Sequence, residues 1–214
     1  EGLDDVLRSN PDLSLIALTT IEFCYNHIRH LLRYLKERTG ALIAVGGIWP
    51  TTAPEHVFVH LPEVDFLARG DGEEIIVPLA AAASAIREGE DAEAVILDVF
   101  GDREGVLARW KDGTASFRID MKNQIPDLDM TKYSFRRFCE DDVKSGISMS
   151  TSRGGIHNCR FCAIGDRSVW RGMSVERVEE IFSDYERRLL DIFGSDGRIP
   201  KTAREIIVWD DDFF

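Results

Sequence analysis

The chain has 214 residues, of which 44% are hydrophobic and 9% aromatic, so it can bury one large core or two small ones. Its formal net charge of −12 argues against general binding to nucleic acids or anionic membranes, because both require clustered Lys and Arg. Apolar runs such as 41–49 are much shorter than the roughly 18 residues of a membrane span, and no basic-then-apolar signal peptide opens the chain. We therefore expect a cytoplasmic protein.

The first hundred residues alternate between strand and helix patterns. Short apolar runs at 13–18, 41–45 and 64–68 are typical of buried parallel strands. Helical patterns follow each run: one with apolar residues at Phe23, Ile28, Leu31, Leu32 and Leu35, one starting at 53–55, and one reaching about Ile86. This order predicts an α/β fold, with a Rossmann-like parallel sheet that binds ligands at its carboxyl edge.

The three predicted strands end in residues that suit ligand binding. They are followed by Thr19-Thr20, by Gly46-Gly47 and by Gly70-Asp71-Gly72-Glu73. Glycine lets a ligand approach the backbone closely, and hydroxyls with helix N-terminal amides suit phosphate or amide groups. A tight turn explains any single glycine equally well, so only the three strand ends together indicate a site.

These strand ends resemble the cobalamin-binding domain that precedes many radical S-adenosylmethionine barrels. The family order is Gly-Gly-x-His-Pro, Pro-Glu and Gly-Glu-Gly-Glu, and this chain has Gly46-Gly47-Ile48-Trp49-Pro50, Pro54-Glu55 and Gly70-Asp71-Gly72-Glu73. The resemblance implies that cobalamin contacts Thr19, Gly46, Gly47, Gly70, Gly72 and Glu73.

Two positions depart from the family pattern. Trp49 stands at the family's frequent His, and Asp71 stands at its usual Glu. None of His27, His30, His56 and His60 lies in the family's Asp-x-His-x-x-Gly motif, which supplies a lower cobalt ligand in some members. We expect His27 and His30 to be ordinary surface or packing residues.

The sequence pattern of residues 95–145 predicts that this segment is a small β-rich linker. The apolar stretch 95–100 suggests a strand, and the stretches 105–110 and 114–119 flank Lys111-Asp112-Gly113, a strong hairpin signal. Residues 125–133 resemble the segment that leads into the barrel in the same family. Cys139 is most simply a packing cysteine.

The alternating segment 147–151 predicts the first strand of a barrel, which delivers the next loop to the carboxyl-terminal mouth where barrel active sites lie. That loop contains Cys159 and Cys162, a close pair that suggests metal binding. Residues 152–162 resemble the cluster loop of radical S-adenosylmethionine enzymes, Ser-Arg-Gly-Cys-x-x-x-Cys-x-aromatic-Cys, with Gly155 at the first cysteine. The resemblance implies that Cys159 and Cys162 bind a 4Fe–4S cluster that chelates S-adenosylmethionine. It also implies that Phe161 lies against the adenine, and Cys139 or His157 could replace the missing ligand.

After the loop, Ser174 can cap a helix whose expected apolar stripe is Val175, Val178, Phe182, Tyr185, Leu189 and Ile192. Residues 205–209 predict the next strand, and Asp210-Asp211-Asp212-Phe213 resemble the end of the family's second barrel strand. This acidic group suits either a hard cation or, more simply, a polar strand end near an active site. The predicted domains are 1–94 for cobalamin binding, 95–145 for the linker and 146–214 for the start of a truncated barrel.

The resemblance implies a cobalamin-dependent radical S-adenosylmethionine enzyme, most often a methyltransferase. Such an enzyme acts on a small-molecule or peptide substrate and takes electrons from a flavodoxin or ferredoxin. The alternative is a non-catalytic remnant of such an enzyme that binds cobalamin or zinc. Zinc requires four ligands, and beside the cysteine pair only His157 is close in sequence.

Overall fold

The structure, a computed structural model, describes residues 2–101, 105–109, 124–155, 157, 162, 169–195 and 197–210, and the backbone of 115–116. Its contacts divide the chain into two compact units, Glu1–Ile125 and Pro126–Phe214. The predicted division at 94 and 145 remains a prediction.

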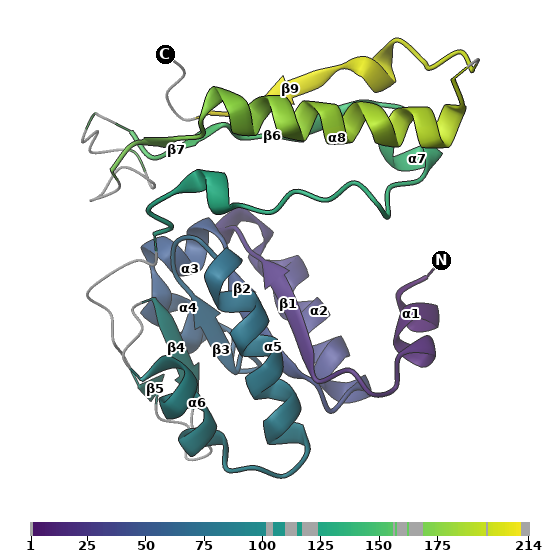
Figure 1. The fold of residues 1–214 in the computed structure, drawn as a ribbon. Helices are drawn as coiled ribbons and strands as arrows, with labels where there is room; N and C mark the ends of the chain where they lie inside the picture. The colour runs from purple at the N-terminus through teal and green to yellow at the C-terminus, as the bar shows by residue number, and fades with distance from the viewer. Residues whose placement is uncertain are drawn as a thin grey trace. The chain divides into compact units, whose positions relative to one another are not determined.

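Unit 1 is built around one mixed sheet (Figure 1). Its elements are α1 (Leu3–Ser9), β1 (Leu15–Thr19), η1 (Glu22–Cys24), α2 (Tyr25–Arg38), β2 (Leu42–Gly46), α3 (Ile48–Thr52), α4 (Pro54–His60), β3 (Phe66–Ala68), α5 (Glu73–Arg87), α6 (Ala92–Phe100), β4 (Val106–Arg109) and β5 (Ala115–Ser116). The strand order is β1-β2-β3-β4-β5. The first three strands pair in parallel and the last two are antiparallel. The predicted α/β fold with a parallel sheet is therefore confirmed.

Helices cover both faces of this sheet, because alternate strand residues point to opposite sides. On one face Ile43 and Val45 of β2 pack in a core with α2, α3 and α4. On the other face Ala44, between them, packs with α5 and α6. Unit 1 is thus a three-layer α/β/α arrangement, with the carboxyl ends of β1, β2 and β3 at a common edge (Figure 1).

The hairpin is observed, but the linker prediction is wrong at residues 95–100. β4 and β5 pair antiparallel and extend the sheet of unit 1, and the predicted turn at 111–113 lies outside the described residues. Residues 95–100 belong to helix α6, because the Asp91 side chain accepts a hydrogen bond from the Ala94 amide and caps it. Ile96 and Phe100, one helical turn apart, are the buried residues of this helix.

One residue of the predicted first helix also lies elsewhere. Phe23 precedes α2, in the short η1 turn, and its side chain is fully exposed. The remaining apolar residues of that pattern do face the core, with Leu32 and Leu35 buried. The helix ends with Thr39 as its C-cap.

Unit 2 contains two parallel strands that pair with each other, and a long helix lies between them in the chain. Its elements are η2 (Leu128–Met130), α7 (Glu140–Val143), β6 (Ile147–Met149), β7 (Ser152–Arg153), β8 (Arg171–Gly172), α8 (Val175–Phe193), η3 (Thr202–Arg204) and β9 (Ile206–Val208). β6 pairs in parallel with β9, and β7 pairs antiparallel with β8. This strand–helix–strand order is the repeating unit expected at the start of a barrel.

The cap and most of the apolar stripe of α8 are confirmed. The Ser174 side chain accepts a hydrogen bond from the Arg177 amide. Ile181, Tyr185 and Leu189 are the buried residues, whereas Phe182 and Val175 are exposed. The predicted stripe was therefore displaced by one residue in its middle turn.

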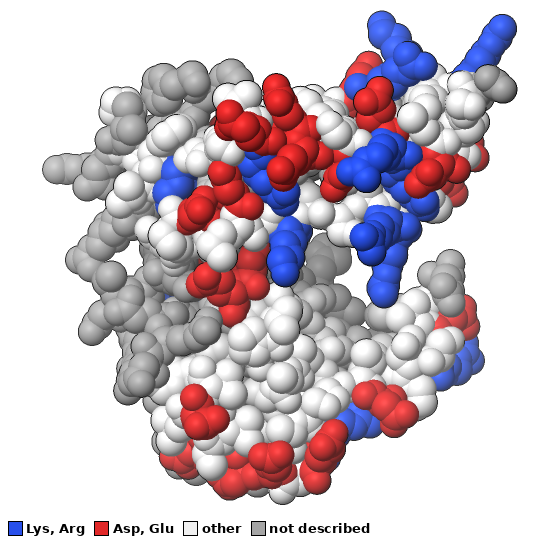
Figure 2. Space-filling view, in the orientation of Figure 1, with Lys and Arg blue, Asp and Glu red and all other residues white. Residues whose placement is uncertain are grey.

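The exposed side of α8 carries charges of both signs. Ion pairs three residues apart join Arg177 to Glu180 and Arg187 to Asp184, and Figure 2 shows acidic and basic groups interleaved along this face. Such exposed pairs contribute little stability. No helix among the described residues combines the length and apolar character needed to cross a bilayer.

Candidate functional site

The ends of β1 and β2 are joined at the carboxyl edge of unit 1. Thr19 pairs with Gly46 in the parallel register. The buried Thr20 donates from its amide and its hydroxyl to the Gly46 carbonyl, at 2.7 and 3.1 Å. Thr20 therefore has a structural role, whereas the Thr19 side chain is exposed at the edge.

A buried threonine that the sequence analysis did not identify joins β2 to β3. Thr51 Oγ1 donates to the Gly47 carbonyl at 2.7 Å and accepts from the Gly70 amide at 2.9 Å. The Arg69 guanidinium donates to the Thr51 carbonyl at 3.0 Å, and burial lowers the pKa of Arg69. Thr51 holds the two glycine turns together from one short helix, α3.

The four predicted glycines fall into two classes. Gly47 and Gly70 have φ of 98° and 83°, which glycine adopts at little cost. A Cβ on Gly47 would also lie 2.9 Å from the Thr20 carbonyl oxygen. The fold itself therefore requires glycine at Gly47 and favours it at Gly70.

Gly46 and Gly72 are not required by the fold in this way. A Cβ on Gly46 would make only ordinary contacts, the nearest at 3.8 Å to the Ala68 carbonyl oxygen, and a Cβ on Gly72 would have nothing within 4 Å. Thr19, Gly46 and Ala68 lie in one row on the sheet face of α5 and α6. Small residues here leave the sheet surface accessible to a bulky ligand.

Helix α5 begins at the same edge. Gly72 is its N-cap, and Glu73 is its exposed first residue. The positive end of a 15-residue helix favours anionic or carbonyl groups of a ligand. This edge thus combines a hydroxyl, a helix N-terminus and open glycines.

The family's histidine position is part of the core here. Trp49 is 3% exposed and packs edge-to-face against Tyr25, with ring centroids 5.9 Å apart. An indole has no lone pair available for a metal ion, so Trp49 supplies no cobalt ligand.

In unit 2, Asp210 holds the start of the predicted cluster loop. One carboxylate oxygen accepts from the amides of Thr151 and Ser152 at 2.7 and 3.0 Å, and the other accepts from the Thr151 hydroxyl at 2.5 Å. Burial raises the pKa of Asp210, but these hydrogen bonds outweigh it, so the pKa is lowered. Asp210 therefore joins the end of β9 to the residues after β6, as the simpler of the two interpretations of the acidic group expects.

The loop is closed at its base by the β7–β8 pair, Ser152 with Gly172 and Arg153 with Arg171. Gly154 has φ of 82°, and its Cβ would lie 2.5 Å from the Val169 carbonyl oxygen. Gly155 and Cys162 are half-buried and His157 is exposed. The other predicted residues here, Cys159, Phe161 and 211–213, lie outside the described residues.

Cys139 lies at the start of α7. It is exposed and caps α7, and its neighbour Phe138 accepts a hydrogen bond from Arg188 near the end of α8. This exposure contradicts the expectation of a packing cysteine. Among the described residues, no three His, Cys, Asp or Glu side chains are placed to hold a metal ion.

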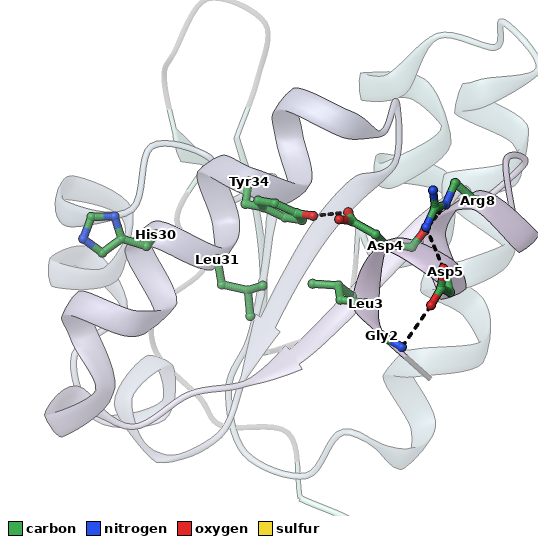
Figure 3. Close-up of a pocket in the computed structure, with 8 residues that line it drawn as sticks. All are labelled: Gly2, Leu3, Asp4, Asp5, Arg8, His30, Leu31 and Tyr34. Carbon is green, nitrogen blue, oxygen red and sulfur yellow. Dashed lines mark hydrogen bonds and ion pairs between the residues drawn. The ribbon is translucent and has the colours of Figure 1, made fainter.

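A separate depression of about 640 Å³ lies between α1 and α2 (Figure 3). Its polar side chains bind each other: Tyr34 donates to Asp4, and Arg8 donates to Asp5 at 2.6 Å. Because α1 leads into β1, this depression lies away from the carboxyl edge. It is a weaker candidate, because its polar groups do not converge on a ligand.

The chain is similar in sequence to known proteins and similar in fold to solved structures. No protein-family model matches the chain. It is 27% identical over 175 residues to the anaerobic magnesium-protoporphyrin IX monomethyl ester cyclase of Synechocystis, covering 79% of this chain and 32% of that protein. It is 28% identical over 183 residues to an uncharacterized methyltransferase of Pyrococcus horikoshii, covering 83% of this chain and 37% of that protein.

Among solved structures, the chain matches the radical S-adenosylmethionine methyltransferase TsrM of Kitasatospora setae, solved with cobalamin and a [4Fe-4S] cluster bound. The TM-score is 0.61 at 17% identity, over 93% of this chain and 38% of TsrM. The resemblance to cobalamin-binding radical S-adenosylmethionine proteins is confirmed. The chain spans about a third of the length of the curated relatives it matches.

Proposed function

We propose that this chain forms part of a cobalamin-dependent radical S-adenosylmethionine enzyme, and that the enzyme is a methyltransferase. In this proposal the carboxyl edge of unit 1 binds cobalamin, and the 152–162 loop of unit 2 holds a 4Fe–4S cluster with S-adenosylmethionine. The order of the two motifs and the fold match across both units support it.

The observation that carries the cobalamin assignment is the open row at the sheet edge. Thr19 is exposed there, and Gly46 and Gly72 lack side chains although the packing around them does not exclude a Cβ. A large planar cofactor with a nucleotide tail needs such a surface, together with a hydroxyl donor and a helix N-terminus. The residues present fit cobalamin, with Gly47, Gly70 and Glu73 shaping and bordering the site.

In the cluster loop, Cys159 and Cys162 would be two ligands and Phe161 would lie against the adenine. Asp210 and the β7–β8 pair would position the loop. Gly155 occupies the place of the family's first cysteine, so cluster binding is weaker than in a three-cysteine loop.

When bound, the cluster with S-adenosylmethionine would supply a radical that removes a hydrogen atom, and cobalamin would supply a methyl group. The substrate class we propose is a small molecule, with a flavodoxin or ferredoxin as electron donor and the cytoplasm as location. TsrM has been solved with tryptophan as substrate, which supports the small-molecule class without identifying the compound used here.

The test of methyl transfer uses the full open reading frame that encodes this chain, reduced and supplied with methyl-labelled S-adenosylmethionine and candidate substrates. We expect 5′-deoxyadenosine, S-adenosylhomocysteine and labelled product together. Deoxyadenosine without S-adenosylhomocysteine or transferred label would reject methyl transfer and leave a radical rearrangement or cyclisation.

A second candidate is a non-catalytic cobalamin- or zinc-binding remnant, and Gly155 is the observation that favours it. Metal analysis after anaerobic purification separates the two functions. Iron with acid-labile sulfide supports the enzyme, whereas zinc or no metal supports the remnant.

A further inference from the structure

Two histidines on α4 lie close together on the surface of unit 1. His56 and His60 are four residues apart, so they occupy the same face of the helix one turn apart. Both are exposed, and their ring centroids are 4.1 Å apart. Neither takes part in the cobalamin or cluster sites proposed above.

Aromatic packing orients both rings. His56 lies edge-to-face on Trp49, and His60 lies edge-to-face on Tyr25, each with centroids 5.9 Å apart. Tyr25 and Trp49 pack against each other at the same distance, and Trp49 is buried. The four rings therefore form a closed cycle anchored in the core, which restricts the rotamers of the two imidazoles.

The two imidazole rings are inclined to each other and are not stacked in parallel. The lone pair of an imidazole nitrogen lies in the plane of its ring. Two parallel stacked rings cannot direct lone pairs to a common point, but the planes of His56 and His60 are inclined at 59°. A metal ion could therefore lie in both ring planes at the usual metal–nitrogen distance of about 2.0–2.1 Å.

We propose that His56 and His60 form a two-histidine site for a late first-row divalent ion such as Cu²⁺, Ni²⁺ or Zn²⁺. Imidazole is a preferred ligand of these ions, and the affinity order places Cu²⁺ first. Because no third His, Cys, Asp or Glu joins the pair among the described residues, water completes the coordination. The site is thus an open, exchangeable one.

The proposal is tested by titrating the intact chain with NiCl₂ and following the imidazole signals of its five histidines by NMR. Paramagnetic Ni²⁺ broadens signals of nearby nuclei. We expect the His56 and His60 signals to broaden first, with assignments from the variants His56→Asn and His60→Asn. Equal broadening of all five at the same Ni²⁺ concentration would overturn the proposal.

His27 and His30 provide the matched control. They are also exposed and also share one helix, α2, but are three residues apart. The variants His27→Asn and His30→Asn should bind Ni²⁺ as the parent does. His56→Asn and His60→Asn should each weaken binding about tenfold or more, because the second imidazole no longer binds intramolecularly.

Binding at the cysteine loop gives a different result. Nickel there would broaden His157, which is close to Cys159 and Cys162 in sequence, before His56 and His60. That order of broadening, or unchanged affinity in both α4 variants, would contradict the two-histidine site. The parent titration decides the question even if one variant fails to fold.

Discussion

At the scale of single residues, the glycines of the carboxyl edge differ in what requires them. Gly47 needs its positive φ and has no space for a Cβ, whereas Gly46, the residue before it, has ordinary φ and ordinary space. The first is explained by the fold and the second by an accessible sheet surface. Substitution of these two adjacent glycines should therefore change the free energy of unfolding by different amounts.

We predict that Gly47→Ala destabilises unit 1 by about 1–3 kcal/mol, from left-handed strain and the contact with Thr20. Gly46→Ala should change the free energy of unfolding by less than about 1 kcal/mol, as substitutions away from special features do. Urea unfolding of both variants measures this. Equal destabilisation would show that Gly46 is also structural.

The sequence could predict these glycines but not Thr51. A run of glycine and hydroxyl residues after apolar strands indicates an edge with ligand potential, because few other residues permit such turns. The Thr51 hydroxyl bonds the carbonyl four residues earlier, which depends on the short helix α3. That helix contains Pro50 and has no sequence signal that separates it from a loop.

At the scale of elements, the sequence predicts the strands that end in glycine turns but does not predict helix α6. Residues 95–100 are Val-Ile-Leu-Asp-Val-Phe, rich in β-branched residues that favour strands. Tertiary packing of Ile96 and Phe100 and the Asp91 cap decide in favour of a helix. Phe23 was misplaced for a similar reason, because the turn between β1 and α2 interrupts the helical period.

Asp210 links the end of β9 to the residues after β6, so its ionisation should change the stability of unit 2 measurably with pH. Its folded pKa is lowered, so its contribution to stability is present above the unfolded value of about 4 and is lost as pH falls through the folded value. We expect the urea midpoint of the parent to fall more steeply below about pH 5 than that of Asp210→Asn. Asp98→Asn, at an exposed position on α6, is the control and should follow the parent. Parallel curves for the parent and Asp210→Asn would remove the assigned role.

The cluster loop gives a second prediction at this scale. Gly155→Cys restores the third thiolate of the family pattern, so anaerobic reconstitution should give about four irons per chain, and the parent should give fewer. Iron and sulfide analysis measures the difference. If the parent already holds as much iron, another ligand such as His157 completes the set.

At the scale of the whole molecule, the chain joins two units whose motifs occur in the order of a larger enzyme. The fold match spans 93% of this chain but only 38% of TsrM. The two motifs could be recognised in the sequence because each follows a short apolar strand, β2 or β3 in unit 1 and β6 in unit 2. The substrate could not be predicted from these two loops, because the family resemblance assigns both of them to cofactor binding.

The central claim is that the carboxyl edge of unit 1 binds cobalamin, and a retention measurement tests it most directly. The chain is mixed with hydroxocobalamin and desalted, and the cobalamin absorbance of the protein peak is measured. Gly46→Leu places a bulky side chain on the open edge. Gly40→Leu, at the opposite end of β2 and with nothing within 4 Å of its Cβ, is the matched control.

We predict about one cobalamin per chain for the parent and for Gly40→Leu, as for a single site on the folded protein, and loss of most of it in Gly46→Leu. No cobalamin on the parent, or equal retention by Gly46→Leu, would contradict the assignment of this edge as the cobalamin site.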